Sequence, residues 1–344
     1  MARSRRVPGL IRFLHSADWQ IGKPYRNVDD AKNRYRLQHE RIAAIERIGA
    51  VVREQQAAFV LVAGDLFDSS TVAAEAVLEA LEAIGALRVP VLVIPGNHDH
   101  GGAGGIWHRD DLQRHQPSLA PNLRLLLERQ PLVLEPALLL PCPLLRHQDS
   151  SDPSQWLRQL DWSALPSDRP RLVLAHGGVH GFSARDYGDD EEAQAGANNL
   201  IDLNALPNAQ IDYIALGDWH NLKQVSPRAW YSGTPEPDRF DQGDDNQRGQ
   251  VLLVQAERGA APRVAVHATG RCRWHNLRVA FQSDDDLDRF ERQLQTLLGA
   301  RVARDLLRLE LSGHLSLAAH QRFERLLEDL RQRVLRLRKI GRAH

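Results

Sequence analysis

The stretch Val91-Leu-Val-Ile-Pro-Gly-Asn-His-Asp99 joins a short apolar run to a turn that carries three polar side chains. An apolar run of this length, bounded by turn residues, is typical of a buried strand. The same pattern occurs earlier, where the run Phe59–Val62 precedes Gly64-Asp65. Between the two runs, the apolar periodicity of Val72–Ala86 predicts a helix. Strand, helix and strand in this order predict a parallel β-α-β unit and an α/β fold.

The pattern repeats on both sides of this unit. A further helix is predicted over Ala31–Gln55, and three more strands each end in a polar or glycine-containing turn. The strands are Leu10–Leu14, Leu172–Ala175 and Tyr213–Leu216, and their turns are His15–Asp18, His176–Gly178 and Gly217–His220. Ligands of open α/β sheets bind beyond the carboxyl ends of the strands. The five strand ends therefore predict one polar site.

A second, smaller domain is predicted after residue 270. Short strands are expected between residues 249 and 267. They are followed by strand Leu277–Phe281, helix Asp285–Leu298, strand Leu306–Leu311 and helix Leu317–Leu335, a small α+β unit. We expect residues 1–270 to form the domain with the site, residues 271–339 an accessory domain, and residues 340–344 a non-native tail. A third strand after Leu335 is expected to be missing.

The composition is that of an ordinary globular protein. Hydrophobic residues make up 42% and charged residues 26%, which argues against a disordered chain. The 44 basic and 44 acidic residues cancel, so any surface for nucleic acid must be local. Cys142 and Cys272 are expected to be reduced and buried. Because neither a signal peptide nor an apolar membrane span of about 18 residues is found, we expect a cytoplasmic protein without membrane association.

The polar residues at the strand ends suit a site for two divalent metal ions. Such a site needs one carboxylate that bridges two cations about 3.5–4 Å apart, and further ligands for each ion. Asp65 is the expected bridge. The other ligands expected from the residues are Asp18, Asn97, His176 and His220. Two cations lower the pKa of the water between them, which supplies a nucleophile for phosphoester hydrolysis.

His98 lies beside a ligand candidate but is not needed as a ligand. We expect it to stabilise the pentavalent phosphorus and to protonate the leaving oxygen. Asp99 is expected to hold the ring of His98 in one tautomer. The neighbouring Trp19 and Trp219 are interpreted as packing residues, and His15 as a structural residue. A single Asp or Asn after a strand is more often a turn or cap residue, but its recurrence at five strand ends favours a site.

Five ordered motifs carry a resemblance to a known family. They are His15-Ser-Ala-Asp18, Gly64-Asp-Leu-Phe-Asp68, Gly96-Asn-His-Asp99, Ala175-His-Gly177 and Gly217-Asp-Trp-His220. In this order they resemble the motifs of calcineurin-like metallophosphoesterases. The later Tyr231-Ser-Gly-Thr-Pro-Glu236 resembles a segment of the SbcD branch of DNA repair exonucleases. The resemblance covers about residues 10–255 and implies a layered sandwich of sheets flanked by helices, with a C-terminal capping domain.

The resemblance also implies how the ligands divide between the two ions. One ion would be held by Asp18, Gln20, Asp65 and His220, and the other by Asp65, Asn97, His176 and Asp218. The family pattern has histidine at positions 20 and 218. The replacements enrich the site in oxygen donors, so we expect Mn²⁺, or Mg²⁺, rather than Zn²⁺. Gln20 is a neutral and weaker ligand, so the first ion is expected to bind more loosely.

Three functions follow from these residues. The first is a manganese-dependent nuclease that acts on DNA ends with an SbcC-like coiled-coil ATPase as partner. Whether this chain also forms a homodimer is left open by the sequence. The second is a phosphoesterase for a small nucleotide or cyclic nucleotide, which would use the same metal chemistry. The third is a catalytically weakened scaffold. Retention of the other ligands and of His98 argues against the third.

Overall fold

The structure, a computed structural model, describes residues 9–179, 198–240, 247–299 and 304–341. The chain divides into two compact units. The first comprises Met1–Pro24, Gln38–Glu236 and Asp245–Gly270, and the second comprises Tyr25–Leu37, Pro237–Asp244 and Arg271–His344. The two short segments of the second unit were expected in the first domain. They join the C-terminal residues instead, because Tyr25 and Phe240 are buried in one cluster with Leu306.

Two six-stranded sheets form the first unit. The first contains β1 (Ile11–Ser16), β2 (Val60–Ala63), β3 (Val91–Ile94), β4 (Leu123–Leu125), β13 (Gln250–Ala256) and β14 (Arg263–Ala268), in the order β14-β13-β1-β2-β3-β4. The second contains β5 (Leu132–Val133), β6 (Leu138–Cys142), β7 (Arg171–His176), β10 (Tyr213–Gly217), β11 (Lys223–Gln224) and β12 (Ala229–Tyr231), in the order β11-β12-β10-β7-β6-β5. A small pair, β8 (Gly178–Val179) and β9 (Leu200–Ile201), is separate.

Each large sheet has a parallel centre. Strands β1 to β4 run parallel, and β13 and β14 add antiparallel strands at one edge. Strands β6, β7, β10 and β12 also run parallel to one another, and β5 and β11 add antiparallel strands at the two edges. The five predicted strands are all present, which confirms the α/β class. A parallel sheet places all carboxyl ends at one edge, so this arrangement is what gathers the polar turns.

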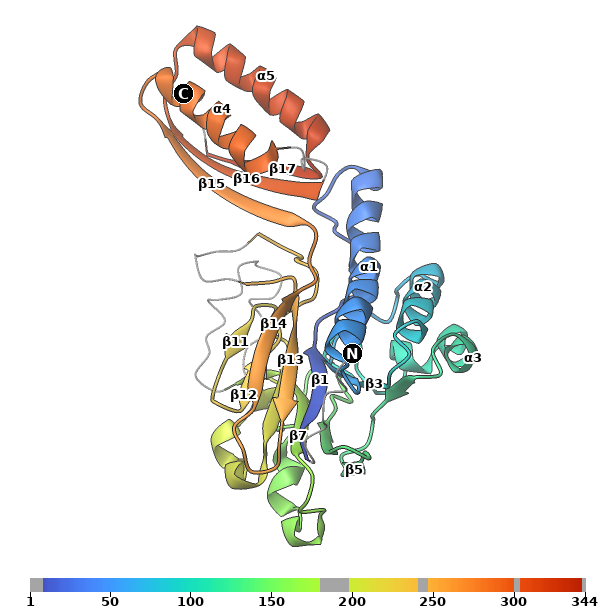
Figure 1. Ribbon diagram of the computed structural model, residues 1–344. Coiled ribbons are helices and arrows are strands. Elements are labelled where there is room, and N and C mark those ends of the chain that lie inside the picture. The colour runs from blue at the N-terminus through green and yellow to red at the C-terminus, as the bar shows by residue number, and fades with distance from the viewer. Residues whose placement is uncertain (1–8, 180–197, 241–246, 300–303, 342–344) are drawn as a thin grey trace, which may run out of the picture. The chain divides into compact units, whose positions relative to one another are not determined.

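The side chains of β2 show how the layers pack. Val60 and Val62 belong to a buried cluster with helices, whereas Leu61 and Ala63 belong to a cluster that contains residues of both sheets. The alternation follows from the two-residue period of a strand. The sheets therefore pack face to face, and helices cover the outer face of the first (Figure 1).

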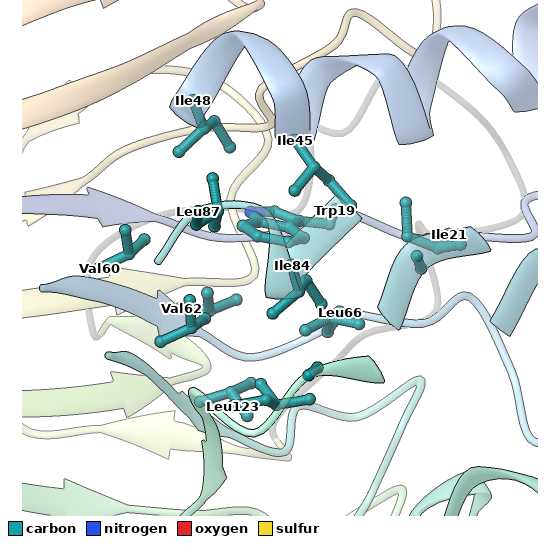
Figure 2. Close-up of a cluster of buried hydrophobic side chains, with 14 of the residues drawn as sticks. Trp19, Ile21, Ile45, Ile48, Val60, Val62, Leu66, Ile84, Leu87 and Leu123 are labelled. Atoms are coloured by element: carbon teal, nitrogen blue, oxygen red, sulfur yellow. The ribbon is translucent and has the colours of Figure 1, made fainter. Parts of the chain in front are cut away.

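Helices α2 (Ala74–Gly85) and α3 (Asp110–Leu119) belong to the first unit, as does α1 (Ala31–Gln55) from Gln38 onward, and α3 was not predicted. Figure 2 shows Trp19 beside Ile45 and Ile48 of α1 and Ile84 of α2, so its packing role is confirmed. Short 3-10 helices are η1 (Ile106–His108), η2 (Gln155–Gln159), η3 (Trp162–Ala164), η5 (Leu203–Ala205) and η6 (Asn208–Gln210). Within the described ranges, every helix is too short or too polar to cross a membrane.

The second unit contains a three-stranded parallel sheet of β15 (Arg273–Phe281), β16 (Asp305–Gly313) and β17 (Arg336–Ile340). Helices α4 (Asp285–Leu298) and α5 (Leu317–Arg333) lie on one face of it (Figure 1). Strand β17 corrects the expectation that the third strand is missing. Its last residue, Ile340, pairs with Glu310 and is part of the fold rather than of a tail. Residues 342–344 lie outside the described residues.

Candidate metal centre

The predicted site residues follow the carboxyl ends of five strands, three from the first sheet and two from the second. Asp18 and Gln20 follow β1, Asp65 follows β2, Asn97, His98 and Asp99 follow β3, His176 ends β7, and Asp218 and His220 follow β10. Hydrogen bonds tie neighbouring ends together within each sheet. The amide of Asp18 donates to the carbonyl oxygen of Gly64 over 3.1 Å, and that of Gly177 to Gly217 over 3.1 Å.

Three of the predicted ligands form a compact buried cluster. Donor atoms of Asp18, Asp65 and His176 all lie within 4.8 Å of one another. None of the three side chains is more than marginally exposed. Two carboxylates and an imidazole nitrogen at this separation can bind a divalent cation. The structure therefore contains a candidate metal-binding triad at the edge that the sequence predicts.

His176 shows which way the ligand atoms face. Its Nδ1 donates to the carbonyl oxygen of Ala63 over 2.8 Å, so Nε2 is directed into the cluster and can offer its lone pair to a cation that displaces its proton. Around Nε2 lie the Oδ1 atoms of Asn97 at 2.8 Å, Asp65 at 3.6 Å and Asp218 at 3.8 Å. Neighbouring ligands of an octahedral ion at about 2.1 Å are about 3 Å apart. The oxygens of Asn97 and Asp65 thus lie near the separation from Nε2 of His176 that ligands of one cation have.

The electrostatics of the cluster favour positive charge. Burial lowers the pKa of His176, but the charges of Asp65, Asp218 and Asp18 outweigh it and raise the pKa to about 9. The pKa of Asp18 is raised well above its usual value, first by burial and then by Asp65 and Asp218, although His176 opposes this. Closely spaced buried carboxylates repel one another unless a cation lies among them. The donor set therefore fits a divalent metal ion.

Backbone strain is concentrated in the same turns. Four predicted ligands, although not glycine, lie in the left-handed region, with φ of 54° at Asp18, 40° at Gln20, 52° at Asp65 and 102° at Asp218. Such conformations cost of order 1–3 kcal/mol each and cluster at functional sites. Gly64, with φ of 88°, has no room for a side chain, because a Cβ there would collide with the ring of His176. The turns that carry the predicted ligands therefore adopt uncommon backbone conformations to bring the ligand side chains together.

His98 lies beside the cluster. Its side chain is 29% exposed, its amide donates to Oδ1 of Asp65 over 2.9 Å, and its Nε2 lies 4.0 Å from Oδ2 of that residue. Nδ1 lies 2.8 Å from the carbonyl oxygen of Asp68 and donates to it, so Nε2 is the nitrogen left to face a substrate. Burial lowers the pKa of His98, but Asp65 and Asp68 raise it above its usual value overall.

The expectation that Asp99 orients His98 is wrong. The buried Asp99 carboxylate accepts hydrogen bonds from the amides of Gly96, Asp65, Leu66 and Phe67, over 2.7 to 3.3 Å. Asp99 thus joins the turn after β3 to the turn after β2 and supports the backbone that carries Asp65. The orienting group of His98 is the Asp68 carbonyl, which a sequence motif cannot reveal because every residue has a carbonyl.

Gln20 and His220 lie together, apart from the group of donors around Nε2 of His176. The buried Gln20 donates from Nε2 to Nε2 of His220 over 3.3 Å, and its Oε1 accepts from Nζ of Lys23 over 2.7 Å. Gln20 therefore presents a donor to His220 rather than the carbonyl oxygen expected to bind the first ion. Sequence reasoning missed Lys23, which belongs to no motif.

Two further residues near the site were also missed. The fully buried Arg41 of α1 donates to the carbonyl oxygens of Trp19 over 2.7 Å and Asp18 over 2.9 Å. Thr234 donates to the same Asp18 oxygen over 2.8 Å. Thr234 lies in the quoted segment 231–236, which was the available signal, whereas nothing distinguishes Arg41 from other helical arginines in the sequence.

Other expectations of supporting roles are confirmed. His15 is buried, with Nδ1 2.9 Å from the Tyr213 hydroxyl and Nε2 3.1 Å from the Leu216 carbonyl oxygen. Burial lowers its pKa to about 3, so it is neutral at physiological pH. Trp219 packs in a core cluster of the second sheet. Cys142 and Cys272 are free and buried.

Comparison with known proteins agrees with this site. The sequence profile of the calcineurin-like phosphoesterase family matches residues 11–222, which include every predicted site residue. The chain is 26% identical over 276 residues to the SbcD subunit of the nuclease SbcCD from Bacillus subtilis (strain 168), a match that covers 72% of this chain and 67% of the relative. A crystal structure of the Thermus thermophilus protein TT1561 matches 76% of this chain and 99% of its own, with 12% identity and a TM-score of 0.45. The chain belongs to the calcineurin-like phosphoesterase family.

Proposed function

We propose that this protein hydrolyses phosphodiester bonds in DNA with two divalent metal ions, as an exonuclease of DNA repair. The observation that carries the proposal is the buried group of Asp18, Asp65 and His176 beside the partly exposed ring of His98. Family membership supports phosphoester hydrolysis, and similarity to a subunit of the SbcCD nuclease supports DNA as the substrate.

The ligands would be the seven residues predicted from the sequence. Asp65 would be the bridge, with Asp18 and His220, and Gln20 once its amide oxygen turns to the ion, on one side and Asn97, His176 and Asp218 on the other. Divalent ions in such a site polarise the phosphoryl group and provide a nucleophile at neutral pH. The backbone holds these side chains in place before a substrate binds, because Asp99 secures the turn of Asp65 and the Asp218 amide donates to the Asp18 carboxylate over 3.1 Å.

His98 is the proposed acid. Its Nδ1 is held by the Asp68 carbonyl, so Nε2 can contact a phosphoryl oxygen and give a proton to the leaving oxygen. Partial exposure of the ring leaves it accessible to a long polymer.

The finer assignments belong to the same proposal. The oxygen-rich donor set favours Mn²⁺, with Mg²⁺ as the alternative. We propose a cytoplasmic protein that works with an SbcC-like ATPase, with residues 271–339 as a capping domain. The sequence similarity to a subunit of a two-part nuclease supports the partner.

A cleavage assay tests this function. Purified protein with Mn²⁺ is expected to release nucleotides from end-labelled linear duplex and single-stranded DNA, and to do so less or not at all after chelation. A cyclic nucleotide and a chromogenic phosphodiester serve as competing substrates. Hydrolysis of the small substrates without any cleavage of DNA would replace the nuclease by a small-molecule phosphoesterase. Absence of all hydrolysis with every metal would support the scaffold function.

A further inference from the structure

The two halves of the metal centre differ in how their donor atoms are arranged. On one side, Oδ1 atoms of Asn97, Asp65 and Asp218 surround Nε2 of His176 at 2.8 to 3.8 Å. On the other side, Gln20 and His220 are hydrogen-bonded to each other. The group whose donor atoms converge within 4.8 Å consists of Asp18, Asp65 and His176, and among the described residues neither His220 nor Asp218 is part of it.

Lys23 determines which end of the Gln20 amide faces His220. An ammonium group has donors only, so the group 2.7 Å from its Nζ must be the amide oxygen of Gln20. The amide nitrogen is then directed to Nε2 of His220, 3.3 Å away. Rotation of the amide by half a turn would place NH₂ against the ammonium, where two donors would face each other.

The same lysine is held in place from a second side. Its Nζ lies 4.0 Å from the Asp68 carboxylate, and its side chain is only 19% exposed. Gln20 is completely buried, so it has little room to adopt another rotamer. A cation bound at Nε2 of His220 would meet an N–H group of Gln20 instead of a lone pair. It would also lie near a fixed positive charge, since the amide of Gln20 contacts Lys23 at one end and His220 at the other.

We propose that Lys23, through Gln20, weakens the first of the two metal positions, so that the chain holds one divalent ion tightly beside His176 and a second weakly beside His220. Lys23 is a positioning residue in this proposal. The inference rests on the proposed function only in taking the site to be binuclear. It adds a cause for the unequal affinity, Lys23, that is not itself a ligand. Lys23 acts on Gln20, which stands where the family pattern has a histidine.

The experiment is calorimetric titration of the metal-free protein with Mn²⁺, with bound metal counted by mass spectrometry. Wild type is expected to show one tight ion and a second that binds at least about 10-fold more weakly. Lys23→Met should tighten the weak ion beside His220 by about 10-fold or more and leave the tight ion beside His176 unchanged, because the amide of Gln20 can then turn its oxygen to the weak ion. Gln20→His should have the same effect by adding a lone pair.

Two matched variants control for charge and folding. Lys23→Arg keeps a cationic donor and should keep the weak second ion. Lys32→Met removes a lysine of α1 that lies outside the site and should titrate like wild type. Unchanged affinity of the tight ion beside His176 in each variant shows that the site is intact. Two ions of equal affinity in wild type, or a weak ion unaffected by Lys23→Met, would overturn the proposal. Because metal binding is read without substrate, failure to cleave DNA would refute the proposed function and leave this result standing.

Discussion

Arg41 donates a hydrogen bond from Nη2 to the backbone carbonyl oxygen of Asp18 over 2.9 Å, although 23 residues separate them in the chain. The same Nη2 donates to the Thr234 hydroxyl over 3.0 Å, and that hydroxyl donates to the same Asp18 oxygen. A buried guanidinium and a buried hydroxyl therefore hold the left-handed turn that carries the first carboxylate of the site. This gives the segment 231–236 a physical role.

Removing the hydroxyl alone should weaken both the fold and the metal site. Thr234→Val keeps the volume but leaves the carbonyl of Asp18 and one donor of Arg41 less satisfied, at a cost of about 1–3 kcal/mol in the free energy of unfolding. Affinity for the metal ion held by Asp18 should fall by about 10-fold or more, because supporting hydrogen bonds orient ligands. Urea unfolding and metal titration measure the two effects.

Thr234→Ser is the control for this change, because it keeps the hydroxyl and loses only a methyl group. It should resemble wild type in metal affinity. If Thr234→Val also binds metal like wild type, the conformation of Asp18 does not depend on this hydrogen bond.

Metal binding and proton transfer should depend on different residues. Asp65→Ala removes the proposed bridge and should lose bound metal and hydrolysis together. His98→Ala should retain its metal and its affinity for DNA and lose about 10²- to 10⁴-fold in turnover, the usual contribution of a general acid. Metal content, DNA binding and cleavage rate are measured for each purified variant.

The opposite pattern would contradict this division. His98→Ala protein that has lost its metal would make His98 a ligand. His98→Gln is a useful companion, since it keeps a hydrogen-bond donor but cannot transfer a proton at neutral pH. It should preserve metal content and remain slow.

The choice of metal should follow the oxygen donors. We expect higher activity with Mn²⁺ than with Zn²⁺, and Asp218→His, which restores the imidazole of the family pattern, should raise the relative activity with Zn²⁺. The measurement is turnover of the metal-free protein against the concentration of each ion. Full activity with Zn²⁺ and none with Mn²⁺ in wild type would refute the oxygen-rich interpretation.

The thiol of Cys142 should be inert in the folded protein. Burial raises its pKa to about 12, so at pH 8 only roughly one thiol in 10⁴ is the reactive thiolate. In a Cys272→Ser variant, which isolates this thiol, a disulfide reagent should give no colour until denaturant is added. Rapid reaction of the native protein would show that the β6 strand opens readily.

Much of the fold could be predicted because local patterns determine it. Helix α1 runs from Ala31 to Gln55 and α4 from Asp285 to Leu298, as predicted, since each has a clear apolar face. The third strand after Leu335 was expected to be missing, whereas residues Arg336–Ile340 form it as β17. Its pairing with β16 depends on residues about 30 positions earlier in the chain.

The candidate site divides in the same way. The residue types that suit metal ions were evident, because Asp, Asn and His recur after apolar strands and parallel strands end at one edge. The role of Asp99 was assigned incorrectly from adjacency to His98. In three dimensions the Asp99 carboxylate lies against backbone amides of another turn, 30 or more residues away in the chain.

The sequence by itself determined the α/β class and the strand ends that bear the polar residues. It also determined that these residues match the motif pattern of a metal-binding family. Periodicity and motif spacing are local properties of the chain, so they can be recognised without knowledge of any tertiary contact. Only the tertiary structure decided that the Asp68 carbonyl holds His98, that Arg41 and Thr234 hold Asp18, and that Lys23 turns the amide of Gln20 toward His220. Each of these depends on where one hydrogen-bonding group lies relative to another, and folding rather than the order of residues sets that distance.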